Sequence, residues 1–180
     1  YLWRILYAEH QQAQALAAAI VGLVHLALLG VVLVRCREDR KLQAALGVLG
    51  TALVTTAIPL YFSALNPTLL SWSVEAVALT FIGIRYRSLW TKAMAFVVGA
   101  IAAVGLFYHL PLHGAEAFRI VYNAPFGTWV FVCAALLVCH AMWRCMSEAQ
   151  DEEGRFTTQA YYAAGVLLTA LGCTLEWMTY

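Results

Sequence analysis

Trp72 and Glu75 are the residues in this chain with the clearest potential for chemistry. They lie three positions apart in the third apolar stretch of the sequence, and residues at that spacing share one face of a helix. Glu75 lies about two helical turns, or roughly 9 Å, into the stretch. A carboxylate at that depth in a bilayer costs a few kcal/mol unless it is paired, protonated or reached by water. Two hypotheses follow: the carboxylate binds a proton, cation or ligand, or it fixes helix packing by a hydrogen bond to Thr55, Thr56 or Ser73.

His25 and His140 form a second candidate pair. They lie at similar depth in the first and fifth apolar stretches, so their imidazoles differ in depth by only about 3 Å. Two membrane histidines at matched depth can be the axial ligands of a b-type haem. The competing hypothesis is that each histidine is hydrogen-bonded in its own surroundings. We favour it, because nothing in the sequence indicates that the two helices face each other.

Residues His109, His113 and Glu116 have the i, i+4, i+7 spacing of a helical metal site. Pro111 lies between the histidines and disfavours a regular helix there, so we expect no metal site. The sequence also contains no nucleophile elbow, phosphate-binding loop, HExxH motif or paired catalytic carboxylates. We therefore expect no enzymatic activity and no catalytic residues.

The composition indicates the environment in which these residues lie. Apolar residues make up 63% of the 180 residues and charged residues 12%, against about 45–50% and 25% in soluble domains. In lipid, every backbone polar group must be paired internally, so a spanning segment is a helix or a strand of a closed barrel. The apolar runs are longer than barrel strands and do not alternate. The net charge of +1 gives no indication of a nucleic-acid partner.

We therefore predict an all-α integral membrane bundle with six transmembrane helices in a single domain, residues 1–180. At 1.5 Å per residue, each helix crosses or nearly crosses a hydrocarbon core of about 30 Å. The predicted spans are 13–34, 42–62, 69–84, 89–108, 126–143 and 159–178.

The basic residues predict an orientation. Of the 11 Lys and Arg residues, all but Arg4 and Arg119 lie in the three loop regions 35–41, 85–92 and 144–158. Basic loops are retained in the cytoplasm. We therefore expect these three loops on the cytoplasmic side and both ends of the chain on the outer side.

Three motifs resemble those of a known family. Ala57-Ile58-Pro59-Leu60 ends one predicted helix, and LSWSVEA at 70–76 opens the next with a Trp-x-x-Glu pattern. FIGIR at 81–85 then closes that helix with an apolar-Gly-x-Arg pattern. Together they resemble the bacterial membrane proteins called the domain of unknown function 2339 family.

The resemblance extends over roughly residues 45 to 178. The segment 118–126, with Asn123 at its centre, and Leu175-Glu176 near the end of the last span are similar to later parts of the family pattern. Members are usually longer and have many spans, so the resemblance implies that this chain is part of a larger protein of the bacterial inner membrane and envelope. It implies no activity, and the two histidines are not part of the pattern.

The leading functional hypothesis is a structural or accessory module, without a cofactor, that packs in the lipid bilayer with other membrane helices or subunits. Small residues at four-residue spacing, such as Gly99 and Ala103, are typical of close helix packing. One alternative is a transporter of a small solute, lipid or proton that uses Glu75. A second alternative is a b-haem electron-transfer subunit with His25 and His140 as ligands.

Overall fold

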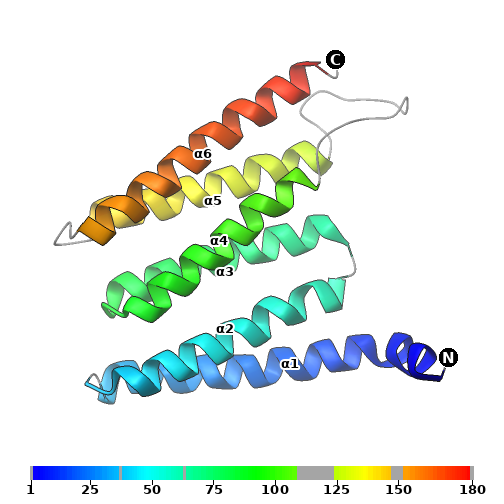
Figure 1. Ribbon diagram of the computed structural model, residues 1–180, viewed down its shortest axis with the longest axis vertical. Helices are drawn as coiled ribbons and strands as arrows, with labels where there is room; N and C mark the ends of the chain where they lie inside the picture. Colours follow the sequence, from blue (N-terminus) through cyan, green and yellow to red (C-terminus); the bar gives the residue numbers. More distant parts are fainter. Residues whose placement is uncertain (1, 37, 63, 109–123, 147–151, 179–180) are drawn as a thin grey trace.

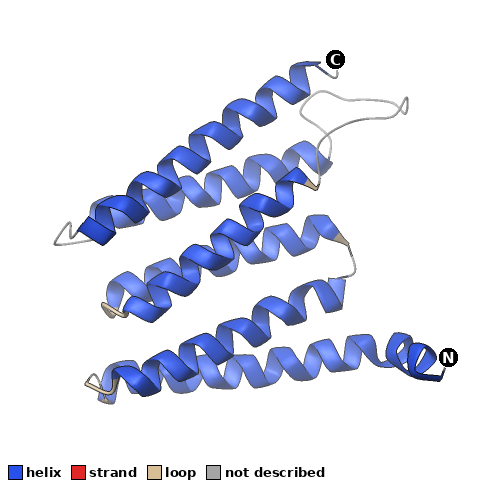
Figure 2. Cartoon of the chain, viewed as in Figure 1, coloured by secondary structure: helices blue, strands red, loops and turns tan. Residues whose placement is uncertain are grey.

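A computed structural model of the protein describes residues 2–36, 38–62, 64–108, 124–146 and 152–178. All regular structure in these ranges is helical (Figure 2), which confirms the predicted all-α class for this part of the chain. The helices are α1 (Leu2–Arg35), α2 (Arg40–Phe62), α3 (Leu65–Arg85), α4 (Leu89–Phe107), α5 (Ala124–Met146) and α6 (Glu152–Met178).

Five of these helices are long and apolar enough to cross a membrane: α2 to α5, and α1 from Gln11 onward. The prediction of six spans is therefore supported for five. The expected sixth span, 159–178, lies on α6, which is long enough but less apolar than the others. Its polar positions include Gln159, two tyrosines and Glu176.

The N-terminal end of α3 also differs from the prediction. An Asn-Pro pair is typical of a turn and the third predicted span begins only at 69, but α3 already begins at Leu65 and includes Asn66-Pro67. Pro67 occupies the first turn of the helix, where a backbone N–H has no intrahelical partner, so the missing donor costs nothing there. The residue before the helix, Ala64, has extended backbone angles and provides no side-chain cap.

The helices form three antiparallel hairpins, α1–α2, α3–α4 and α5–α6, with the α3–α4 hairpin in the middle (Figure 1). On one side of it α2 contacts both α3 and α4, and on the other side α3 packs against α5. Within the described residues α1 contacts α2 and no other helix. The α1–α2 hairpin is thus held to the rest of the bundle through α2.

The largest buried cluster lies between the α3–α4 and α5–α6 hairpins. Trp129 of α5 is almost completely buried, and its indole Nε1 donates a hydrogen bond of 2.7 Å to the carbonyl oxygen of Leu168 on α6. Gly172 lies one turn further along α6, and a Cβ atom there would collide with the Trp129 indole. The close approach of α5 and α6 at this point therefore requires glycine.

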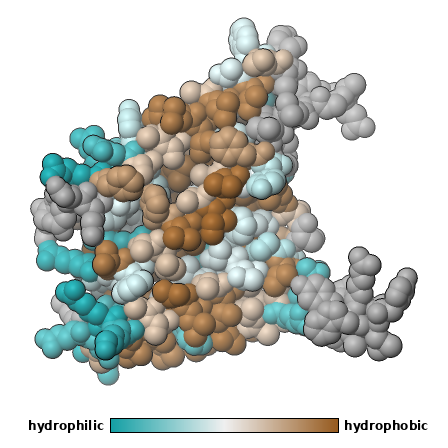
Figure 3. Space-filling model, in the orientation of Figure 1, coloured by the Kyte–Doolittle hydropathy of each residue, from teal (hydrophilic) through white to brown (hydrophobic). Residues whose placement is uncertain are grey.

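Hydrophilic residues gather at one end of the bundle, where α1, α3 and α5 end and α2, α4 and α6 begin (Figures 1 and 3). Arg35, Arg40, Arg85, Arg87 and Arg144 lie at or next to these helix ends. An apolar band covers the middle of the face shown in Figure 3. The described basic residues of the three loop regions thus share one end of the fold.

Candidate functional site

The polar residues singled out in the sequence meet where α2 packs against α3. The Thr55 hydroxyl of α2 lies 3.0 Å and 3.2 Å from the two carboxylate oxygens of Glu75 on α3. The indole Nε1 of Trp72 donates a 3.0 Å hydrogen bond to the Thr55 carbonyl oxygen. We call Thr55, Trp72 and Glu75 the Thr55 cluster. All three side chains are half-buried, and the structure directs Glu75 toward a neighbouring helix of the same chain.

Pro59 explains why the Thr55 carbonyl is open to a side chain. In an α-helix, the carbonyl of residue 55 normally accepts the N–H of residue 59. Proline has no N–H, and Pro59 lies inside α2, so the Thr55 carbonyl has no partner within its own helix. Trp72 supplies the missing donor from α3. The Ala57–Leu60 motif and the Trp-x-x-Glu motif are therefore complementary parts of one contact.

The Glu75 carboxylate receives its hydrogen bond from a single hydroxyl. A threonine hydroxyl has one proton, so it donates to one of the two oxygens at a time. Among the described residues no Lys or Arg forms an ion pair with Glu75. The carboxylate therefore keeps unused acceptor capacity inside the bundle. This arrangement can hold two helices together, and it can also hold a proton.

The structure does not bring His25 and His140 together. His25 lies on α1 and His140 on α5, and these two helices make no contact in the described part of the chain. The His25 Nδ1 lies 2.7 Å from the Val21 carbonyl oxygen of its own helix. The His140 Nδ1 lies 2.9 Å from the carbonyl oxygen of Thr158. Each imidazole thus has its own local partner, and this arrangement does not form the two-histidine haem site considered above.

The residues His109, His113 and Glu116 lie outside the described residues, as do Arg119 and Asn123. Within the described ranges no three His, Cys, Asp or Glu side chains gather in a group that could hold a metal ion.

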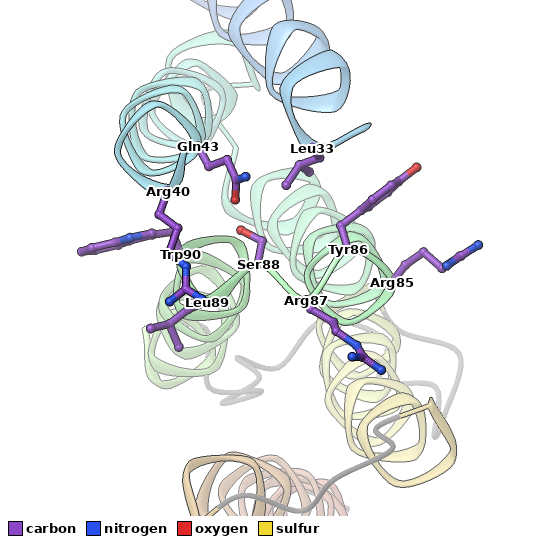
Figure 4. Close-up of a pocket in the computed structure, with 9 residues that line it drawn as sticks. All are labelled: Leu33, Arg40, Gln43, Arg85, Tyr86, Arg87, Ser88, Leu89 and Trp90. Atoms are coloured by element: carbon purple, nitrogen blue, oxygen red, sulfur yellow. The ribbon is translucent and has the colours of Figure 1, made fainter. Parts of the chain in front are cut away.

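One cavity was not anticipated from the sequence. It has a volume of about 670 Å³ and lies at the hydrophilic end, between the ends of α1 and α2 and the α3–α4 turn. Its lining includes Arg40, Arg85, Arg87, Gln43 and Ser88 (Figure 4). The sequence placed these arginines in two basic loops, but no sequence signal indicated that the two loops border one cavity.

A second buried carboxylate was also missed. The sequence places Glu176 near the end of the last predicted span and does not indicate its burial, but only 5% of its surface is exposed. Its position near the end of α6 is correct; its burial depends on how α6 packs against the bundle.

Comparisons with protein-family models, with curated proteins and with solved structures find no match for this chain. The resemblance to the domain of unknown function 2339 family therefore stays a prediction. The functional argument rests on the geometry of the chain.

Proposed function

We propose that this protein is a structural or accessory membrane module that packs, through α1, against other membrane helices or subunits. The observation that carries the proposal is the isolation of α1 within its own chain. α1 contains the most apolar 18-residue stretch of the membrane-length helices, with a mean hydropathy of 2.7, yet only 17% of the residues in that stretch are buried. Its partner inside the described chain is α2 alone.

The outer face of α1 is suited to helix packing. It exposes large aliphatic side chains, and Gly30 lies on the same exposed face with no atom within 4 Å of the position of a Cβ. Small residues at a lipid-facing surface allow a second helix to approach closely. The exposed aliphatic side chains of α1 include Leu16, Ile20, Leu23, Val24, Leu28 and Val31.

The same proposal includes the location of the module. The basic end of the bundle faces the cytoplasm, as expected from the retention of basic loops, and the opposite end faces outward. The membrane is the bacterial inner membrane, and the module is part of a larger envelope protein, as the family resemblance implies. Impermeant labelling of the exposed Cys36 and Cys145, in intact and in opened cells, tests the orientation. Labelling of Cys36 or Cys145 in intact cells would contradict it; labelling of the exposed Cys173, which lies toward the opposite end, would not.

Two glycine substitutions on α1 test the packing role. Gly30→Leu adds a side chain where this chain has none nearby, so the fold is retained while a partner helix is pushed away. Gly22→Leu is the matched control, because a Cβ at Gly22 would lie 2.8 Å from Val54 and so disturbs the α1–α2 contact itself. Co-purification in mild detergent measures the partners, and thermal unfolding measures the fold.

We expect Gly30→Leu to lose co-purifying membrane subunits at unchanged thermal stability, and Gly22→Leu to lower the stability. A wild-type protein that is monomeric in native membranes and recovers no partner would contradict the proposal. A Gly30→Leu protein that keeps all of the partners would contradict the assignment of the contact to α1.

A second candidate function is transport of a proton or small solute through Glu75. The observation that favours it is the single donor that the Thr55 hydroxyl offers to two carboxylate oxygens. An intramembrane carboxylate with free acceptor capacity is a site for a proton or cation. Glu75→Gln keeps an oxygen that can accept from Thr55, so it should remove uptake into proteoliposomes without unfolding the protein. Unchanged uptake would exclude Glu75 as the transport site.

A further inference from the structure

We infer that the cavity at the basic end is a binding site for the phosphate of an anionic phospholipid headgroup. This goes beyond the proposed packing role, which concerns a different surface. Three arginines line the cavity, and none of its lining residues is acidic. Arg40 comes from α2, Arg85 ends α3, and Arg87 lies in the α3–α4 turn. Three cations around one cavity of about 670 Å³ favour an anion as the occupant.

Polar side chains lie in the middle of the cavity, and the arginines lie around it. Figure 4 shows the Gln43 and Ser88 side chains turned toward one another in the middle, with Arg40 on one side and Arg85 and Arg87 on the other. Both Gln43 and Ser88 are buried. The Ser88 Oγ accepts hydrogen bonds from the backbone N–H and the hydroxyl of Thr91. Its own proton is therefore available to donate to a phosphate oxygen.

The N-terminus of α4 lies at the same cavity. Ser88 is the N-cap of this 19-residue helix, and the first backbone N–H groups of a helix carry a partial positive charge that favours phosphate. The nearest acidic side chain in sequence, Asp39, accepts a 3.0 Å hydrogen bond from the backbone N–H of Leu42. It is thus engaged at the start of α2.

The position of the cavity favours a lipid over a soluble phosphate. Arg40 and Arg85 lie at the ends of apolar helices of membrane length. The ends of such helices lie at the depth of the lipid headgroups. The rim includes Leu89 and Trp90, which are 61% and 46% exposed. Aliphatic and aromatic side chains at this depth can contact the acyl chains below a bound headgroup. Basic pockets between transmembrane helices on the cytoplasmic side bind such anionic headgroups.

The backbone of Arg87 supports a role for its side chain. Arg87 has a φ of 54°, a conformation that favours glycine and is strained for other residues. Arginine at this position places a cation beside the cavity at a cost in backbone strain. Arg87→Gly therefore removes the charge and relieves the backbone at the same time.

Lipid retention by the purified full chain tests the inference. The protein in detergent is titrated with phosphatidylglycerol or with phosphatidylcholine, and bound lipid is measured by native mass spectrometry. We expect phosphatidylglycerol to bind preferentially, and each of Arg40→Gln, Arg85→Gln and Arg87→Gly to weaken it by about fivefold. Arg144→Gln is the matched control, because Arg144 is an exposed arginine at the same end and does not line the cavity.

Three outcomes would overturn the inference, and one comparison excludes misfolding as the cause of a lost interaction. Equal binding of the two lipids would show that the anionic headgroup is not recognised. An equal loss with Arg144→Gln would show that the general charge of this end, and not the cavity, is responsible. Inorganic phosphate in large excess should leave bound phosphatidylglycerol in place; complete displacement would assign the site to a soluble phosphate. A loss of binding in Arg87→Gly without lower thermal stability would show that misfolding is not the cause.

Discussion

Trp72 of α3 donates its indole N–H to the carbonyl of Thr55, the carbonyl that Pro59 of α2 leaves without an intrahelical partner. The proline and the tryptophan are 13 positions apart in the sequence and lie on different helices, yet one removes a hydrogen bond and the other restores it. The pair joins the α1–α2 hairpin to the middle of the bundle, where α2 has contacts with α3 and α4.

Removing the indole N–H tests this relationship. Trp72→Phe keeps an aromatic ring but leaves the Thr55 carbonyl unsatisfied, so we expect a loss of about 1–3 kcal/mol in the free energy of unfolding. Pro59→Ala restores an N–H at position 59, so Trp72→Phe should cost much less in that background. Unfolding of the four proteins in one detergent gives the coupling energy of the cycle. Equal costs in both backgrounds would show that Trp72 does not replace the missing helix bond.

We expect the Thr55 hydroxyl to stabilise the fold only when Glu75 is present. Thr55→Val removes the donor and leaves the carboxylate without a hydrogen bond, which should cost about 1–2 kcal/mol of stability. In a Glu75→Leu background the same substitution should have little effect, since no carboxylate remains to be satisfied. Thr55→Ser retains the hydroxyl and is the control in both backgrounds. A similar cost of Thr55→Val with and without Glu75 would assign the effect to the threonine alone.

Gly172 should not tolerate a side chain. Its Cβ would collide with the Trp129 indole, so Gly172→Ala should lower stability by about 1–3 kcal/mol and change the tryptophan fluorescence. Gly127→Ala on α5 is the control, because nothing lies within 4 Å of its Cβ position. Alanine favours a helix over glycine by up to about 1 kcal/mol, so this variant should be neutral or more stable. Two variants of equal stability would mean that α6 can shift at no cost.

The strained backbone at Arg87 predicts a difference between two substitutions. Arg87→Gly and Arg87→Ala both remove the guanidinium, but alanine keeps the cost of a positive φ and glycine does not. We expect the glycine variant to be more stable than the alanine variant by about 1 kcal/mol. Thermal unfolding in the absence of anionic lipid measures the difference. A more stable alanine variant would show that the α3–α4 turn relaxes to another conformation.

The sequence by itself determines the helical class and most of the helix positions, because a long apolar run that does not alternate can pair all of its backbone groups within itself only as a helix. It also singles out Trp72 and Glu75 as a candidate polar site, since a carboxylate in an apolar run costs free energy wherever its side chain points. It misjudges the start of α3, because a proline after an asparagine indicates a turn and also fits the first turn of a helix. The sixth span, 159–178, stays a prediction, because α6 is long enough to cross a membrane but its polar residues lower its mean hydropathy.

The tertiary structure decides which residues meet. The Thr55–Glu75 hydrogen bond depends on α2 lying beside α3, and the separation of His25 from His140 depends on α1 lying outside α2. The basic cavity forms because the fold brings the loop regions 35–41 and 85–92, which are far apart in the sequence, next to each other. The position of a residue along an apolar run indicates how deep it lies in a membrane helix but not which neighbour it faces, because lipid and protein interiors are equally apolar. Which helices contact each other is therefore decided by how they pack together, and the sequence of a single helix does not show this.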